Sequence, residues 1–170
     1  MGATKFFWKL DVHTCIFAVS MKLEEAIQSN QFKSPSQKAA VNILYTAWWL
    51  RTLANTSLKE FDLTHEQYNV LRILKGKHPQ AMCTKDIASR VIEKSSNVPR
   101  ITDRLLAKKW IARCQGTADR RETISSLTPT GLEVLAKATK AMEHNMGKKL
   151  QLSGGDAAQL NELLERLQQD

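Results

Sequence analysis

A basic segment followed by an arginine-rich turn limits the fold more than any other part of this chain. Residues 94–110, KSSNVPRITDRLLAKKW, have the apolar spacing of a helix that carries cations on its outer face. Residues 119–131, DRRETISSLTPTG, follow with two arginines near the tip of a predicted β-hairpin. Such a helix fits a major groove, and the hairpin tip carries cations to the neighbouring minor groove or backbone. The pair predicts a mainly α fold with a small β-hairpin wing, a winged helix-turn-helix that reads duplex DNA.

The positive charge of the chain is concentrated in the same region. The 170 residues carry a net charge of +8. Residues 72–121 hold 13 basic and 4 acidic side chains, a net charge of +9, whereas the other 120 residues hold 12 basic and 13 acidic side chains. A local excess of this kind indicates a surface for a polyanion, in preference to a solvated basic face.

Several other functions find no support in the sequence. Cys15, Cys83 and Cys114 lie far apart and lack metal-site spacing, which indicates free thiols in a reducing cytoplasm rather than disulfides or a zinc site. The sequence contains no glycine-rich phosphate loop, nucleophile elbow or metal-ligand triad. We therefore expect no enzyme activity, no catalytic residues, no cofactor and no metal, and a cytoplasmic, nucleoid-associated location without membrane contact.

Helix-start signals and apolar patterns divide the chain into four segments. Residues 1–33 are expected to form a leader that is in part non-native. Residues 34–62 predict an N-terminal dimerisation helix, because their apolar side chains lie on more than one face and need two partners. Residues 63–128 predict the DNA-binding lobe. Residues 129–170 predict C-terminal dimerisation helices, with a leucine stripe at 160–167.

Side chains that can cap helices mark where most of the predicted helices begin. A Ser or Thr at the N-cap accepts a hydrogen bond from the backbone of the first turn. At Thr64, a glutamine three residues later predicts a capping box. The predicted N-caps are Ser34, Thr64, Thr84, Ser95 or Ser96, Thr128 and Ser153.

The chain from about residue 35 to 170 resembles the MarR family of bacterial transcription regulators. The specific part is the pattern D-R-R-(x)5-L-T-P-x-G, which spans residues 119–131, and SSNVPRITDRLL (95–106) is similar to the family's recognition helix. The resemblance implies a homodimer whose first and last helices interlock, with each recognition helix in a major-groove half-site. It also implies repression of a promoter, with release by a small ligand or an oxidant. Trp110 departs from the pattern, since the family usually has Gly after the recognition helix, and this leaves the angle of the wing open.

Candidate DNA contacts lie on the predicted helix and wing. The resemblance implies that Arg121 enters the minor groove and that Asp119 orients it. Asn97 can bond an adenine edge and Arg100 a guanine edge, although Arg100 is equally suited to a phosphate. The candidates are Lys85, Ser95, Ser96, Asn97, Arg100, Arg104, Arg113, Asp119, Arg120 and Arg121.

A small aromatic effector is a further expected partner, beside double-stranded DNA and a second copy of the chain. Trp48, Trp49, His65 and Tyr68 could line a cleft for it between the dimer helices and the DNA lobe, although core packing is the favoured alternative. Two other functions remain open. A sequence-neutral architectural protein would share the basic patch, and a winged-helix adaptor for proteins would bind DNA weakly and with little dependence on salt.

Overall fold

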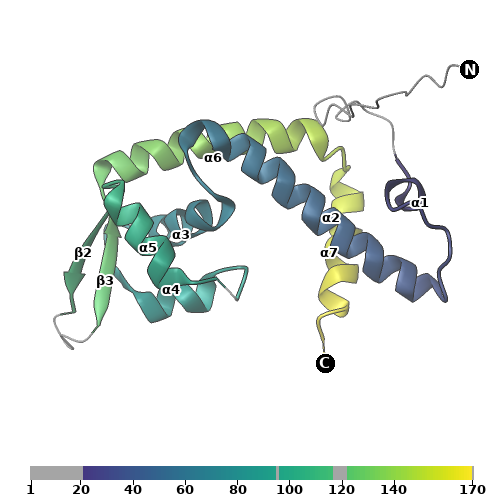
Figure 1. Cartoon of the computed structure of the whole chain (residues 1–170), viewed down its shortest axis with the longest axis horizontal. Coiled ribbons are helices and arrows are strands. Elements are labelled where there is room, and N and C mark those ends of the chain that lie inside the picture. Colours follow the sequence, from purple (N-terminus) through teal and green to yellow (C-terminus); the bar gives the residue numbers. More distant parts are fainter. Residues whose placement is uncertain (1–20, 95, 117–121, 170) are drawn as a thin grey trace, which may run out of the picture. The chain divides into compact units, whose positions relative to one another are not determined.

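The computed structural model describes residues 21–94, 96–116 and 122–169. The chain divides into two compact units, Met1–Thr46 and Ala47–Asp170, of which the second contains most of the helices and the sheet (Figure 1). In the first unit, the short helix α1 (Leu23–Ala26) precedes the start of α2 (Pro35–Leu58). The Lys38 ammonium forms an ion pair with Glu24, and this contact holds the pKa of the Glu24 carboxyl below its ordinary value.

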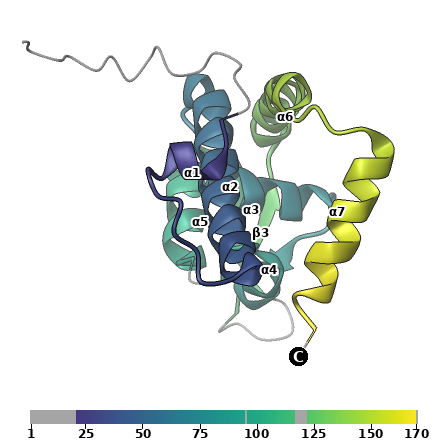
Figure 2. The ribbon, with the colours of Figure 1, turned by 90° about the vertical axis from the view of Figure 1, so that its right-hand side faces the viewer.

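The second unit has the element order of a winged helix-turn-helix, flanked by longer helices. None of the helices in the described part of the chain has both the length and the apolarity to cross a membrane. After α6 the chain changes direction, so that α6 is seen end-on in Figure 2 whereas α7 is seen from the side. The elements that follow α2 are the 3-10 helix η1 (Lys59–Phe61), α3 (His65–Lys75), β1 (Met82–Cys83), α4 (Thr84–Arg90), α5 (Val98–Ala107), β2 (Ile111–Gln115), β3 (Thr123–Leu127), α6 (Pro129–Lys149) and α7 (Gly154–Arg166).

The wing is a three-stranded antiparallel sheet with the strand order β1-β3-β2. β2 and β3 form the predicted hairpin, with a register that runs from Ile111 opposite Leu127 to Gln115 opposite Thr123. The two-residue strand β1 adds Met82 opposite Ser125. The sequence analysis missed β1, because two residues are too short to show an alternating pattern.

One apolar core joins the end of α2 to α3, α4, α5, the sheet and α6. Full burial of a side chain the size of leucine contributes about 1.5–3 kcal/mol relative to exposure, so this core is the main stabilising feature of the lobe. The apolar residues with at most 1% of their surface exposed are Ala54, Leu58, Val70, Leu71, Leu74, Ile87, Val98, Leu105, Ile111 and Ala138.

Most of the predicted helix starts are confirmed. Thr64 and Gln67 form the expected capping box, in which each side chain accepts a hydrogen bond from the other's backbone N–H. Thr128 Oγ1 accepts from Gly131 N at 3.0 Å, and Ser153 Oγ accepts from Asp156 N at 3.1 Å. Each of these caps satisfies a first-turn donor that has no partner within its own helix.

Two predicted caps were wrong by one residue. The cap of α4 is Cys83, whose Sγ accepts from Asp86 N, because the Thr84 hydroxyl donates instead to Thr123 O in β3. The cap of α5 is Asn97, whose Oδ1 accepts from Arg100 N at 3.1 Å, and not Ser96. In the first case a tertiary contact removes the side chain that local sequence favours.

The departure at Trp110 lies one residue earlier than the sequence analysis placed it. Lys109 has the left-handed backbone, with φ 59°, and Trp110 N then donates to Leu105 O at 3.1 Å to close the helix. A left-handed conformation costs a residue with a Cβ about 1 kcal/mol, so glycine would suit position 109 better than lysine does.

Thr128 and Gly131 join the start of α6 to the end of α5. Thr128 Oγ1 donates to Lys109 O at 2.8 Å, and Thr128 N donates to Trp110 O at 3.1 Å. A Cβ on Gly131 would lie 2.0 Å from Trp110 O. The T-P-x-G sequence is therefore explained by packing, since only glycine allows this approach.

Candidate nucleic-acid interface

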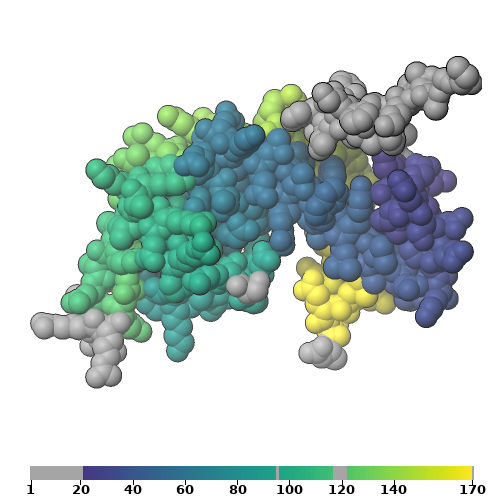
Figure 3. Space-filling model, viewed as in Figure 1, coloured from purple at the N-terminus to yellow at the C-terminus, as the bar shows by residue number. Residues whose placement is uncertain are grey.

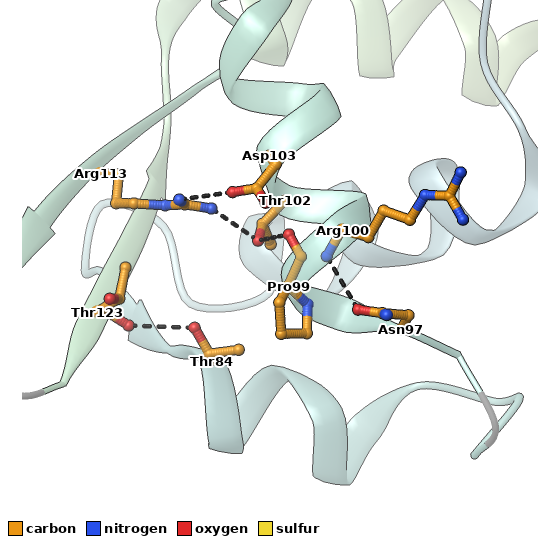
Figure 4. Close-up of polar contacts among 8 residues, drawn as sticks. All are labelled: Thr84, Asn97, Pro99, Arg100, Thr102, Asp103, Arg113 and Thr123. Carbon is orange, nitrogen blue, oxygen red and sulfur yellow. Dashed lines mark hydrogen bonds and ion pairs between the residues drawn. The ribbon is translucent and has the colours of Figure 1, made fainter.

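Helix α5 presents one buried face and one polar face, as a recognition helix must. Val98, Thr102 and Leu105 are buried against the lobe, whereas Arg100 and Arg104 are exposed. Side chains of the region that contains α4 and α5 cover one face of the lobe in Figure 3. In Figure 4 the Arg100 side chain extends away from Thr102 and Arg113. Arg100 is thus free to approach DNA.

The side-chain oxygen of Asn97 already accepts a hydrogen bond within the protein, which conflicts with the predicted contact to an adenine edge. Its Oδ1 caps α5 through Arg100 N (Figure 4). A bidentate contact to adenine uses the oxygen and the NH2 of the same amide. The cap therefore competes with that contact, and the NH2 group is the part of Asn97 best able to reach a base or a phosphate.

The other predicted contacts divide into exposed residues and residues outside the described part of the chain. Lys85, in the first turn of α4, and Arg104 are exposed, and Ser96 is half-buried before α5. The remaining candidates, Ser95, Asp119, Arg120 and Arg121, lie outside the described residues.

Arg113 is directed toward α5 rather than toward solvent (Figure 4). Its Nη1 forms an ion pair with Asp103 Oδ1 at 2.7 Å, and its Nη2 donates to Thr102 Oγ1 at 2.9 Å. Its Nε and the Ser125 Oγ of the facing strand are both buried, and neither has a hydrogen-bond partner among the described residues. The structure thus places this predicted DNA contact between the wing and the recognition helix.

A second cation holds the opposite end of α5. Lys108 Nζ lies 2.7 Å from Asp62 Oδ2 and also donates to the Asp62 carbonyl, and it lies 4.6 Å from the centre of the Trp110 ring. Asp62 has a left-handed backbone, with φ 51°. The sequence analysis missed this pair, because the two residues are far apart in the chain and share no motif.

A groove of about 720 Å³ lies beside this ion pair, between the start of α3 and the end of α5. Partial burial raises the pKa of Glu66 in this groove, but hydrogen bonds from its own backbone and from the Thr64 hydroxyl outweigh that effect, so that the pKa lies below its ordinary value. The lining residues are Asn55, Lys59, Asp62, Leu63, Thr64, Glu66, Gln67, Arg104, Ala107 and Lys108.

The four residues predicted to bind an effector are not among those that line this groove. Tyr68 is 6% exposed, and its hydroxyl lies 3.2 Å from Thr139 Oγ1, which places it in the core. Trp48 is exposed, Trp49 and His65 are half-buried, and His65 N donates to Asn55 Oδ1. Among the described residues, no group of three or more His, Cys, Asp or Glu side chains could hold a metal ion.

Comparison with known proteins gives one family for the lobe. Residues 63–123 match the model of the MarR family. The chain is similar to a MarR transcription factor from Planctomyces limnophilus, with 28% identity over 81% of this chain and 97% of that chain and a TM-score of 0.62. No curated protein matches the sequence.

Two further solved structures share the fold at lower identity. The MepR–DNA complex of S. aureus has 22% identity over 75% of this chain and 94% of that chain, with a TM-score of 0.68. BpsR of Bordetella bronchiseptica, a protein whose DNA binding is regulated by 6-hydroxynicotinic acid, has 20% identity over 82% of this chain and 100% of that chain, with a TM-score of 0.71. The predicted winged helix-turn-helix is therefore confirmed.

Proposed function

Because residues 63–123 match the model of the MarR family, we propose that this protein is a homodimeric repressor that binds a pseudo-palindromic operator. The observation that carries the proposal is the open N-terminal end of α5, with Arg100 exposed there, in a region of net charge +9. Two copies related by a twofold axis would set their recognition helices in successive major grooves. Since the family consists of transcription regulators and not enzymes, the expectation that the chain is not an enzyme is confirmed.

The DNA contacts are assigned by the exposure and chemistry of each side chain. Arg100 and the NH2 group of Asn97 are best placed for base edges. Lys85 and Arg104 suit phosphates, and Ser96 suits a phosphate beside the start of α5. In the wing, Arg121 would enter the minor groove, with Asp119 to orient it and Arg120 as a backbone contact. Ser95, before α5, would contact DNA near the start of that helix.

Dimerisation is assigned to residues 34–62 and 129–170, outside the DNA-binding lobe at 63–128. Helix α7 has no buried residue, and Leu160, Leu163 and Leu167 are 43%, 55% and 66% exposed. Leucines at this helical spacing form an apolar stripe, and a stripe of this kind is stable in water only against a partner. A second copy of the chain is the partner that a twofold operator requires.

Release by a small ligand belongs to the same proposal. The groove between α3 and α5 contains Lys59, Arg104 and Lys108 as well as Asp62 and Glu66. A small aromatic carboxylate could meet cations there and pack on Leu63, and it would contact the recognition helix directly. The repressor would act in the cytoplasm, in association with the nucleoid.

Selection from a library of random duplexes tests the proposal. The expected result is one twofold-symmetric site, bound with an affinity that falls on the order of a thousandfold between low and moderate salt. Equal binding to all duplexes would instead indicate an architectural protein. Weak binding that does not depend on salt would indicate an adaptor for proteins.

Substitutions in the wing test its part in reading the selected site. Arg121→Ala should lose about 1–3 kcal/mol per half-site, the usual range for one good contact to DNA. Asp119→Ala should lose less, because the arginine keeps its charge. Binding equal to the parent for both variants, with the dimer intact, would remove the wing from the interface.

A further inference from the structure

Arg113 has a geometry that direct DNA contact does not explain. It lies on β2 opposite Ser125, and its side chain is 27% exposed. Both terminal nitrogens are engaged, with Asp103 and with Thr102, and Nε has no accessible surface. An arginine that grips a phosphate presents a fork of free N–H groups to it. Here the fork is directed at the recognition helix instead (Figure 4).

The contacts of Arg113 continue to the end of α5 that approaches DNA. Thr102 Oγ1, which accepts from Arg113, donates in turn to Pro99 O at 2.8 Å. Pro99 lies in the first turn of α5, beside Arg100. A chain of polar contacts therefore joins the wing strand to the turn that carries the proposed base contacts.

The contacts around Arg113 include unsatisfied polar atoms, which lower the stability of the fold. Arg113 Nε and Ser125 Oγ are both buried without a hydrogen-bond partner in the part of the chain that the structure describes, at positions that face each other in the sheet. Apolar side chains of similar volume would avoid this penalty. A half-buried arginine with a buried, unbonded Nε is better explained by the geometry that it imposes than by the stability that it adds.

We propose that Arg113 is a positioning residue, which together with Asp103 and Thr102 fixes the first turn of α5 relative to the wing and does not touch DNA. This inference rests on the proposed function, because it concerns how the same interface is held. It assigns Arg113 a role in the choice of operator rather than in general affinity for duplex DNA.

Asp103→Asn tests whether Asp103 positions α5 or only adds negative charge near DNA, because the two roles predict different changes in DNA affinity. The side chain is 63% exposed, so the substitution should leave the fold intact. Loss of an acidic charge near DNA should by itself tighten binding to every duplex. If Asp103 positions α5 through Arg113, the ratio of affinity for the selected operator to affinity for random duplex should fall about tenfold.

Asp62→Asn is the matched control. It removes the acid of the other ion pair of α5, with Lys108, and asparagine tolerates the left-handed backbone at this position. The charge change equals that of Asp103→Asn, but no wing strand is involved. The ratio of operator to random affinity should therefore stay within about twofold of the parent.

Arg113→Ala distinguishes a positioning role from a phosphate contact. We expect it to lower the operator-to-random ratio as Asp103→Asn does, with no further loss in the double variant, because both break the same contact. The slope of log affinity against log salt should equal that of the parent. A slope smaller by about one per subunit, with equal losses on both duplexes, would make Arg113 a phosphate contact and overturn the inference.

Amide hydrogen exchange reports on the same contacts without DNA. Asp103→Asn and Arg113→Ala should each speed exchange in residues 98–102 at least severalfold, whereas Asp62→Asn should not. Unchanged exchange in both variants would overturn the inference, even where the parent binds its operator as proposed. If the parent selects no operator, the proposed function fails, and the exchange rates still decide whether Arg113 holds α5.

Discussion

The winged-helix lobe and helix α7 differ in the burial of their apolar side chains. In the lobe, leucines such as Leu71 and Leu105 are fully buried within one chain. Leu160 and Leu163 in α7 and Leu167 at its C-cap remain exposed, and no residue of the helix is buried. The apolar side chains of the lobe thus have buried partners within one chain, whereas the leucines of α7 have none among the described residues.

The difference does not come from local helix signals. α7 begins at a Ser153 cap with Asp156 in its first turn, as well formed as the Thr128 cap of α6. Both helices satisfy their first-turn donors in the same way. What separates the two regions is burial, as expected if the proposed DNA reading and the proposed dimerisation are divided between them.

The largest expected effect comes from a charge on the exposed stripe. Leu163→Asp removes one leucine per subunit from the proposed interface, a loss of about 3–6 kcal/mol for the pair. Dimerisation should weaken about 10²- to 10⁴-fold, as measured by sedimentation. Asn161→Asp, at an exposed position of α7 outside the leucine stripe, adds the same charge and should weaken the dimer far less. Equal dimerisation of both variants would contradict the role given to α7.

A matched substitution in the lobe should act on folding instead. Leu105→Ala leaves a cavity in the core and should lower the free energy of unfolding by about 2–5 kcal/mol. Measured by urea unfolding in the Leu163→Asp background, this loss should not vary with protein concentration. A loss that depends on concentration would show that the lobe core is itself completed by the partner.

Gly131→Ala tests the joint between the recognition helix and α6. The added methyl group would meet the Trp110 carbonyl, so the backbone must shift, and we expect a loss of about 1–3 kcal/mol in the free energy of unfolding. Gly147, whose Cβ would meet nothing, provides the control, since Gly147→Ala should be neutral or stabilising. Similar thermal unfolding of the two variants would remove the packing explanation for this glycine.

The smallest expected effect is a gain. Lys109→Gly removes the Cβ from a left-handed residue and should raise the free energy of unfolding of the lobe by about 1 kcal/mol or slightly less. Trp110→Gly at the neighbouring position should destabilise, because the indole packs on the core and on Lys108. The opposite order of stability in thermal unfolding would place the strain at Trp110, where the sequence analysis put it.

Local features of the fold could be predicted from the sequence, and features that depend on distant residues could not. The Thr64 capping box and the Thr128 and Ser153 caps involve residues three apart in the chain, and the sequence contains all that they need. Thr84 failed as a cap because Thr123, in the wing, takes its hydroxyl. The strand β1 was missed for a similar reason, since it exists only through pairing with β3.

The candidate site shows the same limit at the level of single residues. Composition and motif identified the basic helix, and Arg100 is exposed there as expected. Composition and motif could not tell that Arg100 and Arg113 differ in exposure and contacts, because both are basic residues near the helix. Only the fold brings Arg113 into an ion pair with Asp103. The asparagine expected to read a base was also the better cap, a competition that the sequence alone does not resolve.

The number of chains bound to one operator tests the central claim most directly, namely that the lobe reads DNA but only a pair of copies reads a full site. The measurement is the mass of the complex formed on the selected duplex and on a duplex that holds one half-site. We predict two chains on the full site and binding to the half-site at least about a hundredfold weaker, because the second lobe and its contacts are lost. One chain per full site, with equal affinity for the half-site, would contradict the account.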